Sequence, residues 1–217
     1  MVRYRPWRDP VRLVSAGVFV ASLAGFTIVA ARQGNLEFVF YGATMVVMAA
    51  AVVLVDAIAG LSRASILGLL AWALLHLAGG NVPIEGAGVL YNYRPTPWLP
   101  KYDQATHAFG FGVATLVCWE CLRSALVRRL GRPARPTAGL MVACVLMGTG
   151  LGALNEVVEF VAVLTMPSTN VGGYVNTGWD LVSNLVGAAA VGAGLWVLGR
   201  SRRRREDAGE GRPESPR

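Results

Sequence analysis

The sequence predicts an all-α fold, a polytopic bundle of about six transmembrane helices. Three observations predict it: the apolar composition, six long apolar runs, and the placement of the arginines between these runs. Of 217 residues, 54% are hydrophobic and only 15% are charged, whereas about a quarter of the residues of a soluble domain are charged. A soluble chain this apolar could not cover its own surface with polar side chains, so we expect lipid to be its solvent.

Each apolar run is long enough to cross about 30 Å of hydrocarbon at about 1.5 Å per helical residue. The six runs cover residues 11–31, 38–59, 65–83, 104–126, 137–165 and 177–199. Several arginines precede the first run, as basic residues precede the apolar segment of a signal peptide. Its apolar core is longer than that of a typical signal peptide and five more runs follow, so we expect it to be retained as a helix.

The distribution of Lys and Arg predicts the orientation. A six-span topology puts seventeen of the 20 cations on the side that holds both termini and three on the other side. Positive residues favour the cytoplasm, so both termini are expected there. The chain then divides into a basic cytoplasmic segment (1–10), a transmembrane domain (11–199) and an Arg-rich tail (200–217), expected to be disordered because it lacks apolar periodicity. The cations flank spans and form no nucleic-acid reading module, which argues against nucleic acid as a partner.

Ionisable side chains inside the spans are candidate functional residues, because charge within a membrane is costly. Two of them, Asp56 and Glu120, lie toward the cytoplasmic ends, where Arg63 and Arg123 are the expected partners. The others come from four different spans, and the predicted topology brings them all to the outer half of the membrane. They are His76, Asp103, His107, Glu156, Glu159 and Asp180.

The spacing of these residues supports a shared site. Three pairs lie three or four residues apart, so each pair occupies one helix face; the pairs are Asp103 with His107, Glu156 with Glu159, and Asp180 with Asn184. Two neighbouring glutamates at this depth need a cation or a proton. Two histidines with several carboxylates suit Zn²⁺ or another divalent transition metal. The alternative is that these groups only form hydrogen bonds between neighbouring helices.

Four segments carry a resemblance to a known family. They are HLAGG (76–80), KYDQATHAFGFG (101–112), NEVVEF (155–160) and GWDLVSNLVGA (178–188). In these segments the chain resembles the YjdF-like family of bacterial inner-membrane proteins, a domain of unknown function. More distantly it is similar to VanZ-like membrane proteins, which are associated with envelope and glycopeptide-resistance phenotypes. The resemblance implies a multi-pass protein of the bacterial plasma (inner) membrane, and it selects seven site residues: His76, Asp103, His107, Glu156, Glu159, Asp180 and Asn184.

Three hypotheses about function follow from these residues. In the first, the outward-facing site is metal-dependent and acts on a lipid or envelope substrate, with Glu156 as the catalytic general base. Its metal ligands would be His76, His107, Glu159 and Asp180, supported by Asp103 and Asn184. In the second, the site binds or transports a lipid headgroup, a proton or a cation without catalysis. In the third, the polar core only fixes helix packing. The sequence does not predict an oligomeric state.

Overall fold

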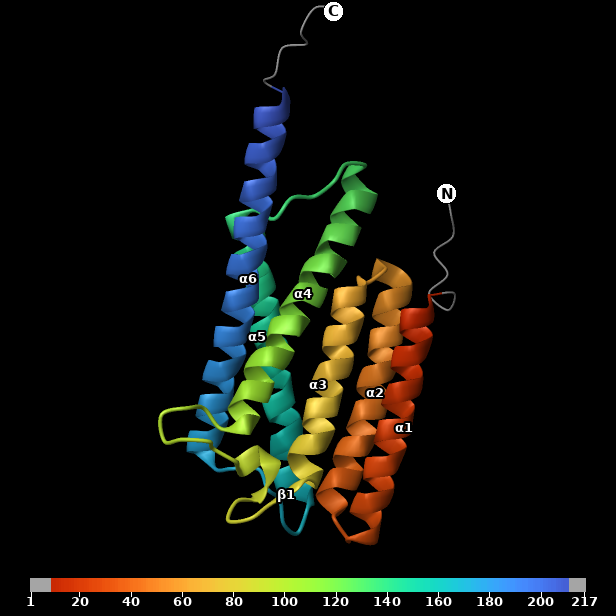
Figure 1. Ribbon diagram of the computed structural model, residues 1–217, viewed down its shortest axis with the longest axis vertical. Helices are drawn as coiled ribbons and strands as arrows, with labels where there is room; N and C mark the ends of the chain where they lie inside the picture. The colour runs from red at the N-terminus through yellow and green to blue at the C-terminus, as the bar shows by residue number, and fades with distance from the viewer. Residues whose placement is uncertain (1–8, 211–217) are drawn as a thin grey trace, which may run out of the picture.

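The computed structural model describes residues 9–210, which form a bundle of six long α-helices (Figure 1). The helices are α1 Pro10–Arg32, α2 Leu36–Ala59, α3 Arg63–Asn81, α4 Tyr102–Leu130, α5 Ala138–Thr165 and α6 Tyr174–Glu210. All six are long and apolar enough to cross a membrane. The predicted all-α transmembrane bundle of six spans is therefore confirmed.

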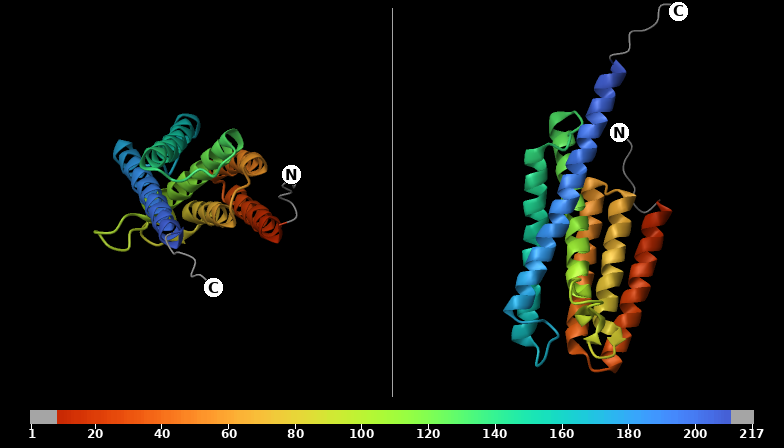
Figure 2. Two further views of the ribbon diagram at one scale, coloured as in Figure 1. Left: turned by 90° about the horizontal axis from the view of Figure 1, so that it is seen from above. Right: turned by 60° about the vertical axis from the view of Figure 1, so that its left-hand side comes forward.

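The helix α4 joins two halves of the bundle. Helices α1 to α3 form one half and α5 and α6 lie on the other side of α4, which contacts α3, α5 and α6 (Figure 2). The chain enters α1 and leaves α6 at the same end of the bundle (Figure 1). We call the opposite end, which holds the α1–α2, α3–α4 and α5–α6 connections, the distal end.

Local signals explain where the helices begin and end. The Asp9 side chain accepts a hydrogen bond from the backbone N–H of Val11, and Pro10 stands at the first helical position of α1. Both features are typical of helix starts. Gly60 ends α2 in the left-handed conformation at φ 69°, and Gly131 ends α4 in the same way at φ 66°. Glycine adopts this conformation without steric cost.

The α3–α4 connection folds back over the distal end of α3. Strands β1 (Pro83–Ile84) and β2 (Gly88–Val89) form an antiparallel hairpin, and a short 3₁₀ helix, η2 (Leu90–Asn92), follows. The ring of Tyr91 in η2 lies against Gly79, where any Cβ atom would collide with it. The glycine thus allows the tyrosine to reach the interior of the bundle.

Small residues let α4, α5 and α6 approach closely, as the sequence predicts. A Cβ atom at Gly152 of α5 would lie 2.5 Å from the Nδ2 of Asn184 on α6. A Cβ atom at Gly187 of α6 would collide with the carbonyl oxygen of Ala108 on α4. The polar faces of the three helices are consequently brought within reach of one another.

The structure differs from the sequence prediction in the extent of α6. This helix continues to Glu210, into the segment after residue 199 for which no regular structure was expected. The segment contains Arg, Glu and Ala, which favour helix, so helix can propagate from the preceding span without help from apolar periodicity. Residues 1–8 and 211–217 lie outside the described part of the chain.

At the end that holds the termini, the partner of Asp56 is Arg12 rather than the predicted Arg63. The Nε of Arg12 lies 2.8 Å from one carboxylate oxygen of Asp56, and a second guanidinium nitrogen lies 3.0 Å from the other. Arg63 instead reaches Asp9 at 3.2 Å. Arg63 is near Asp56 in the chain, but it begins the next helix, whereas the antiparallel packing of α1 on α2 brings Arg12 to this carboxylate.

Glu120 of α4 also has different partners from those predicted. It accepts hydrogen bonds from the backbone N–H of Ser62 at 3.0 Å and from the hydroxyl of Ser65 at 2.8 Å. Glu120 therefore fastens the beginning of α3 to α4, and within residues 9–210 no ion pair joins it to Arg123.

Candidate functional site

The site is centred on His107, a buried residue in the distal half of α4. Asp103 lies one turn earlier on the same face, and its Oδ1 is 3.6 Å from the Nε2 of His107. This pair has the geometry that its i,i+4 spacing predicts.

Helix α5 contributes two carboxylates to the same imidazole. The Oε1 of Glu156 lies 3.5 Å from the Nδ1 of His107, and the Oε1 of Glu159 lies 3.8 Å from its Nε2. Asn155 donates a hydrogen bond to the Oε1 of Glu159 at 2.9 Å. This hydrogen bond holds the carboxylate of Glu159 in place beside His107.

Helix α6 completes the group with Asn184 and Asp180, which are both fully buried. The Oδ1 of Asn184 lies 3.1 Å from the Nδ1 of His107. Asp180 accepts a hydrogen bond from the side-chain amide of Asn176 at 2.5 Å, and Asn176 in turn accepts one from the Nζ of Lys101 at 2.9 Å. The ammonium group of Lys101 is therefore linked to Asp180 through the side chain of Asn176.

Several buried polar atoms of the site have no hydrogen-bond partner among the described residues. They are both carboxylate oxygens of Glu156, the Oδ1 of Asp180 and the Nδ2 of Asn184. Leaving such an atom unpaired costs about 1–3 kcal/mol, so native proteins rarely tolerate several together. Four carboxylates around one imidazole also carry an excess of negative charge. Both facts make the site suited to a cation or to protons.

The donor atoms fit a metal ion in type and spacing. Two triplets have ligand atoms that all lie within 4.8 Å of one another: Asp103, His107 and Asp180, and His107, Glu156 and Glu159. Imidazole nitrogen combined with carboxylate oxygen suits Zn²⁺ and other divalent transition metals. Because both triplets share His107, they describe alternative ligand choices around one imidazole.

His76 is the one predicted metal ligand that belongs to neither triplet. Its Nδ1 contacts the hydroxyl of Tyr91, which also donates a hydrogen bond to the His76 carbonyl at 3.0 Å. Burial raises the pKa of Tyr91 well above the ordinary value of a phenol, so this hydroxyl stays protonated and available as a donor. The structure therefore brings six of the seven predicted residues around one point and holds the seventh on Tyr91.

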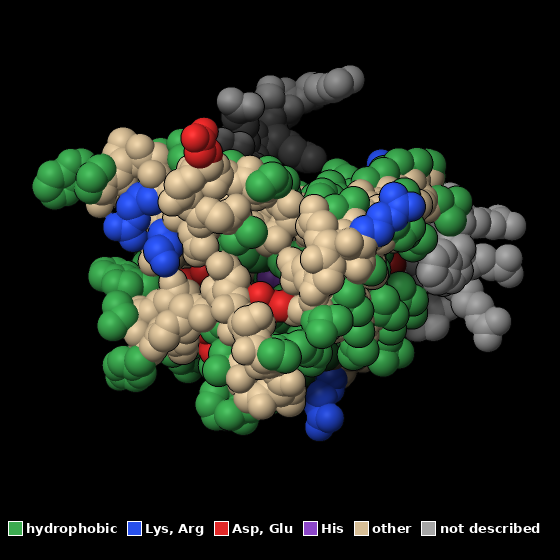
Figure 3. Space-filling model, turned by 90° about the horizontal axis from the view of Figure 1, so that it is seen from below, with side chains coloured by type: hydrophobic (Ala, Val, Ile, Leu, Met, Phe, Trp, Pro, Cys, Tyr) green, Lys and Arg blue, Asp and Glu red, His purple; other side chains and the backbone are tan. Residues whose placement is uncertain are grey.

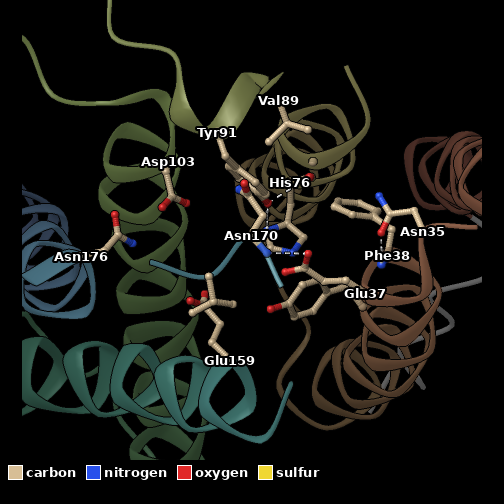
Figure 4. Close-up of a pocket in the computed structure, with 13 residues that line it drawn as sticks. Asn35, Glu37, Phe38, His76, Val89, Tyr91, Asp103, Glu159, Asn170 and Asn176 are labelled. Carbon is tan, nitrogen blue, oxygen red and sulfur yellow. Dashed lines mark hydrogen bonds between the residues drawn. The ribbon is translucent and has the colours of Figure 1, made fainter. Parts of the chain in front are cut away.

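A small cavity of about 60 Å³ separates His76 from the other site residues. Asp103 and Glu159 point toward the same space from α4 and α5, with His76 and Tyr91 across from them (Figure 4). From the distal end, carboxylate and histidine atoms are visible in a central hollow of the surface (Figure 3). The site is thus reached from the distal end of the bundle.

Sequence reasoning missed two kinds of residue that the structure adds. Glu37, in the first turn of α2, lines the cavity together with Tyr41 and Asn170. Glu37 could have been found as a carboxylate at the distal end of a predicted span. Tyr91 carries no such signal, because its role depends on how the α3–α4 connection folds back over the helices. Asn176 lies four residues before Asp180 on α6 and could have been found from that spacing.

Six membrane-length helices around a buried His/carboxylate group define this chain as a polytopic integral membrane protein. The chain belongs to the family described as "Predicted membrane protein (DUF2238)", whose family model matches residues 12–201. This membership is consistent with the resemblance to YjdF-like proteins, whereas the more distant likeness to VanZ-like proteins is not shown. No curated protein and no solved structure matches the chain.

Proposed function

We propose that the distal polar site binds one divalent transition metal ion, such as Zn²⁺, and that the protein uses it to act on a lipid or envelope substrate. The observation that carries this proposal is the set of buried, unpaired carboxylate oxygens of Glu156 and Asp180 beside His107. A single cation beside His107 would satisfy the free oxygen of Asp180 and offset the excess negative charge that Glu156 adds to the site.

The hydrogen bond of Asn184 selects the nitrogen that takes the metal. When the Nδ1–H of His107 donates to the Oδ1 of Asn184, the Nε2 keeps its lone pair. Asp103 and Glu159 lie 3.6 and 3.8 Å from this Nε2. Ligand atoms on a tetrahedral zinc ion, each about 2.0–2.1 Å from the metal, are about 3.3 Å apart. Asp103 and Asp180 form a triplet with His107 whose ligand atoms lie within 4.8 Å of one another, so a contraction of this triplet would put its atoms at coordination distance.

In this arrangement His107, Asp103 and Asp180 would hold the ion, Glu159 would join them only after moving closer, and His76 is not a ligand. Such an ion makes a bound water a stronger acid and polarises an ester carbonyl or phosphoryl oxygen. Glu156 faces the imidazole from α5 with neither oxygen hydrogen-bonded to a described residue. It is suited to accept the proton of an attacking water and to return it to the leaving group.

The location of the site supports a substrate of the outer envelope. The six-span topology puts seventeen of the 20 cations on the side of the termini, which supports the distal end as the outer face of a bacterial plasma membrane. A site beneath that face is accessible to lipid headgroups and to envelope components.

Elemental analysis of the purified protein in mild detergent tests this proposal. We expect about one transition metal ion per chain in the wild type, and loss of the ion in His107→Ala and Glu159→Gln. The Glu85→Gln variant is the control, because Glu85 is exposed in the distal hairpin and lines neither the cavity nor the metal triplets. A monodisperse wild type that holds no metal and takes none up on titration would overturn the proposal.

A second candidate is proton or cation binding without catalysis. The i,i+3 pair Glu156 and Glu159 favours it, because the unpaired oxygens of Glu156 could equally be satisfied by protons. Flux into reconstituted vesicles distinguishes the two candidates. A flux that Glu156→Gln abolishes, in protein without metal, would support this second function.

A further inference from the structure

Two hollows at the distal end share part of their walls. The inner one is the cavity of about 60 Å³ that reaches Asp103 and Glu159. The outer one, of about 490 Å³, lies between the α1–α2 connection and the α5–α6 connection, at residues 34–37 and 167–170. Both are lined by Asn35, Glu37 and Asn170, so these residues form the partition between them.

Hydrogen bonds hold the partition in place. The backbone N–H of Asn170 donates to the Oε2 of Glu37 at 2.8 Å. The side chain of Asn170 accepts a hydrogen bond from Asn92 at 3.0 Å, which ties it to the α3–α4 connection. Asn170 is exposed and Glu37 is half-buried. A single carboxylate therefore stands where the open hollow meets the inner cavity.

The described walls of both hollows carry negative charge and no Lys or Arg. Glu37, Asp103 and Glu159 line the inner cavity, and Glu37 is the charged residue of the outer one. A passage lined by one sign of charge between low-dielectric walls concentrates counter-ions and raises their rate of arrival by about 10- to 1,000-fold. Asp103 and Glu159, which line the inner cavity, lie beside His107. The same group of residues holds the unpaired oxygens of Glu156 and Asp180, which a cation or a proton would satisfy.

We propose that the two hollows form the access path of a divalent cation to the buried site, and that Glu37 is the specificity-determining carboxylate of that path. This inference rests on the proposed metal site and adds a second, transient cation site at Glu37. The path admits cations and rejects anions. Asn170 must release Glu37 as the ion passes, so the α5–α6 connection takes part in admission.

The rate of Co²⁺ binding, followed by its visible absorption in a stopped-flow instrument, tests this inference on the full chain in detergent. Glu37→Gln is the informative variant, because glutamine keeps an oxygen that can accept the N–H of Asn170 and removes only the charge. We expect its association rate constant to fall about tenfold or more, with the stoichiometry of binding unchanged. Glu85→Gln, which removes an exposed distal carboxylate outside the path, should bind at the wild-type rate.

Salt dependence gives a second measurement that needs no variant. Raising the salt from about 0.01 to about 0.15 M shortens the Debye length from about 30 to about 8 Å. The wild-type association rate should fall over this range, and that of Glu37→Gln should fall less. Should Glu37→Gln not fold, a salt-independent wild-type rate would by itself overturn the inference.

The remaining outcomes separate this inference from the proposed function. Equal rates in wild type and Glu37→Gln, or equal slowing by Glu85→Gln, would overturn the access path and leave the metal site standing. Loss of Co²⁺ stoichiometry in Glu37→Gln would make Glu37 a ligand and also overturn the path. A wild type that binds no Co²⁺ would overturn both proposals.

Discussion

At the scale of single residues, the amide of Asn184 has the largest consequence for the site. Its oxygen lies 3.1 Å from the Nδ1 of His107, and this contact decides which imidazole nitrogen faces Asp103 and Glu159. A hydrogen bond to the second nitrogen is the usual way in which a protein fixes the tautomer and ring orientation of a metal-binding histidine. Asn184 is thus a positioning residue for the ligand His107.

Asn184→Ala should lower the affinity for Zn²⁺ by about 10- to 100-fold, because it frees the imidazole to rotate and to change tautomer. Asn184→Asp keeps an acceptor in the same place and should restore most of the affinity. Competition with a chromophoric chelator measures both values. Equal affinity in wild type and Asn184→Ala would show that the amide does not orient the ligand.

Residue spacing predicted much of this site, because two residues three or four positions apart lie on one face of a helix whatever the rest of the fold. The i,i+4 separation of Asp103 and His107 was enough to predict that their side chains lie together. The predicted partner of Asp56 was wrong for the opposite reason: Arg12 meets it through packing between α1 and α2. Tyr91 was missed likewise, because the α3–α4 connection brings it to the cavity. Glu37 was missed although it stands at the distal end of a predicted span.

At the scale of whole helices, glycines set the distances on which the site depends. Gly187 of α6 touches the backbone of Ala108 on α4, and Gly152 of α5 faces Asn184. These contacts lie beside His107 and Glu156 in the chain, so separating the helices would separate the ligands as well. The sequence indicated close packing, but only the structure shows which glycine faces which helix.

Gly187→Ala should therefore destabilise the protein by about 1–3 kcal/mol, the typical cost of forcing an extra carbon atom into a packed contact. It should also reduce metal content. Gly194→Ala on the same helix is the matched control, because a Cβ atom there would meet nothing within 4 Å. Thermal unfolding in detergent measures the stability of both variants, and equal melting temperatures would contradict the predicted contact.

At the scale of the whole molecule, the two ends of the bundle differ in how their buried charged side chains are paired. At the end of the termini, Asp56 is bound by Arg12, and Asp9 pairs with both Arg12 and Arg63. At the distal end, the oxygens of Glu156 are unpaired within the described chain. The ion pairs at the end of the termini join α1, α2 and α3. The unpaired carboxylate at the distal end is suited to bind a cation or a proton.

Asp56→Ala separates these two roles. It leaves the buried Arg12 without its main anionic partner, and breaking a buried ion pair costs about 3–5 kcal/mol. Thermal unfolding should show this loss, while the fraction that remains folded should still bind metal with the wild-type stoichiometry. Loss of metal from folded Asp56→Ala would contradict the division of roles between the two ends.

The orientation of the bundle would decide which compartment supplies the substrate. The orientation that we propose rests on charge alone, because the six-span topology puts seventeen cations on one side and three on the other. We expect a cysteine introduced by Glu85→Cys, in a background whose Cys118, Cys121 and Cys144 are replaced by serine, to react with a membrane-impermeant thiol reagent on intact cells. A cysteine introduced by Arg204→Cys, in the continuation of α6 beyond the bundle, should react only after the membrane is permeabilised. The reverse pattern would turn the site toward the cytoplasm. An envelope substrate would then be excluded, whereas the metal site and the cation path would keep their chemistry and draw on the cytoplasmic metal pool.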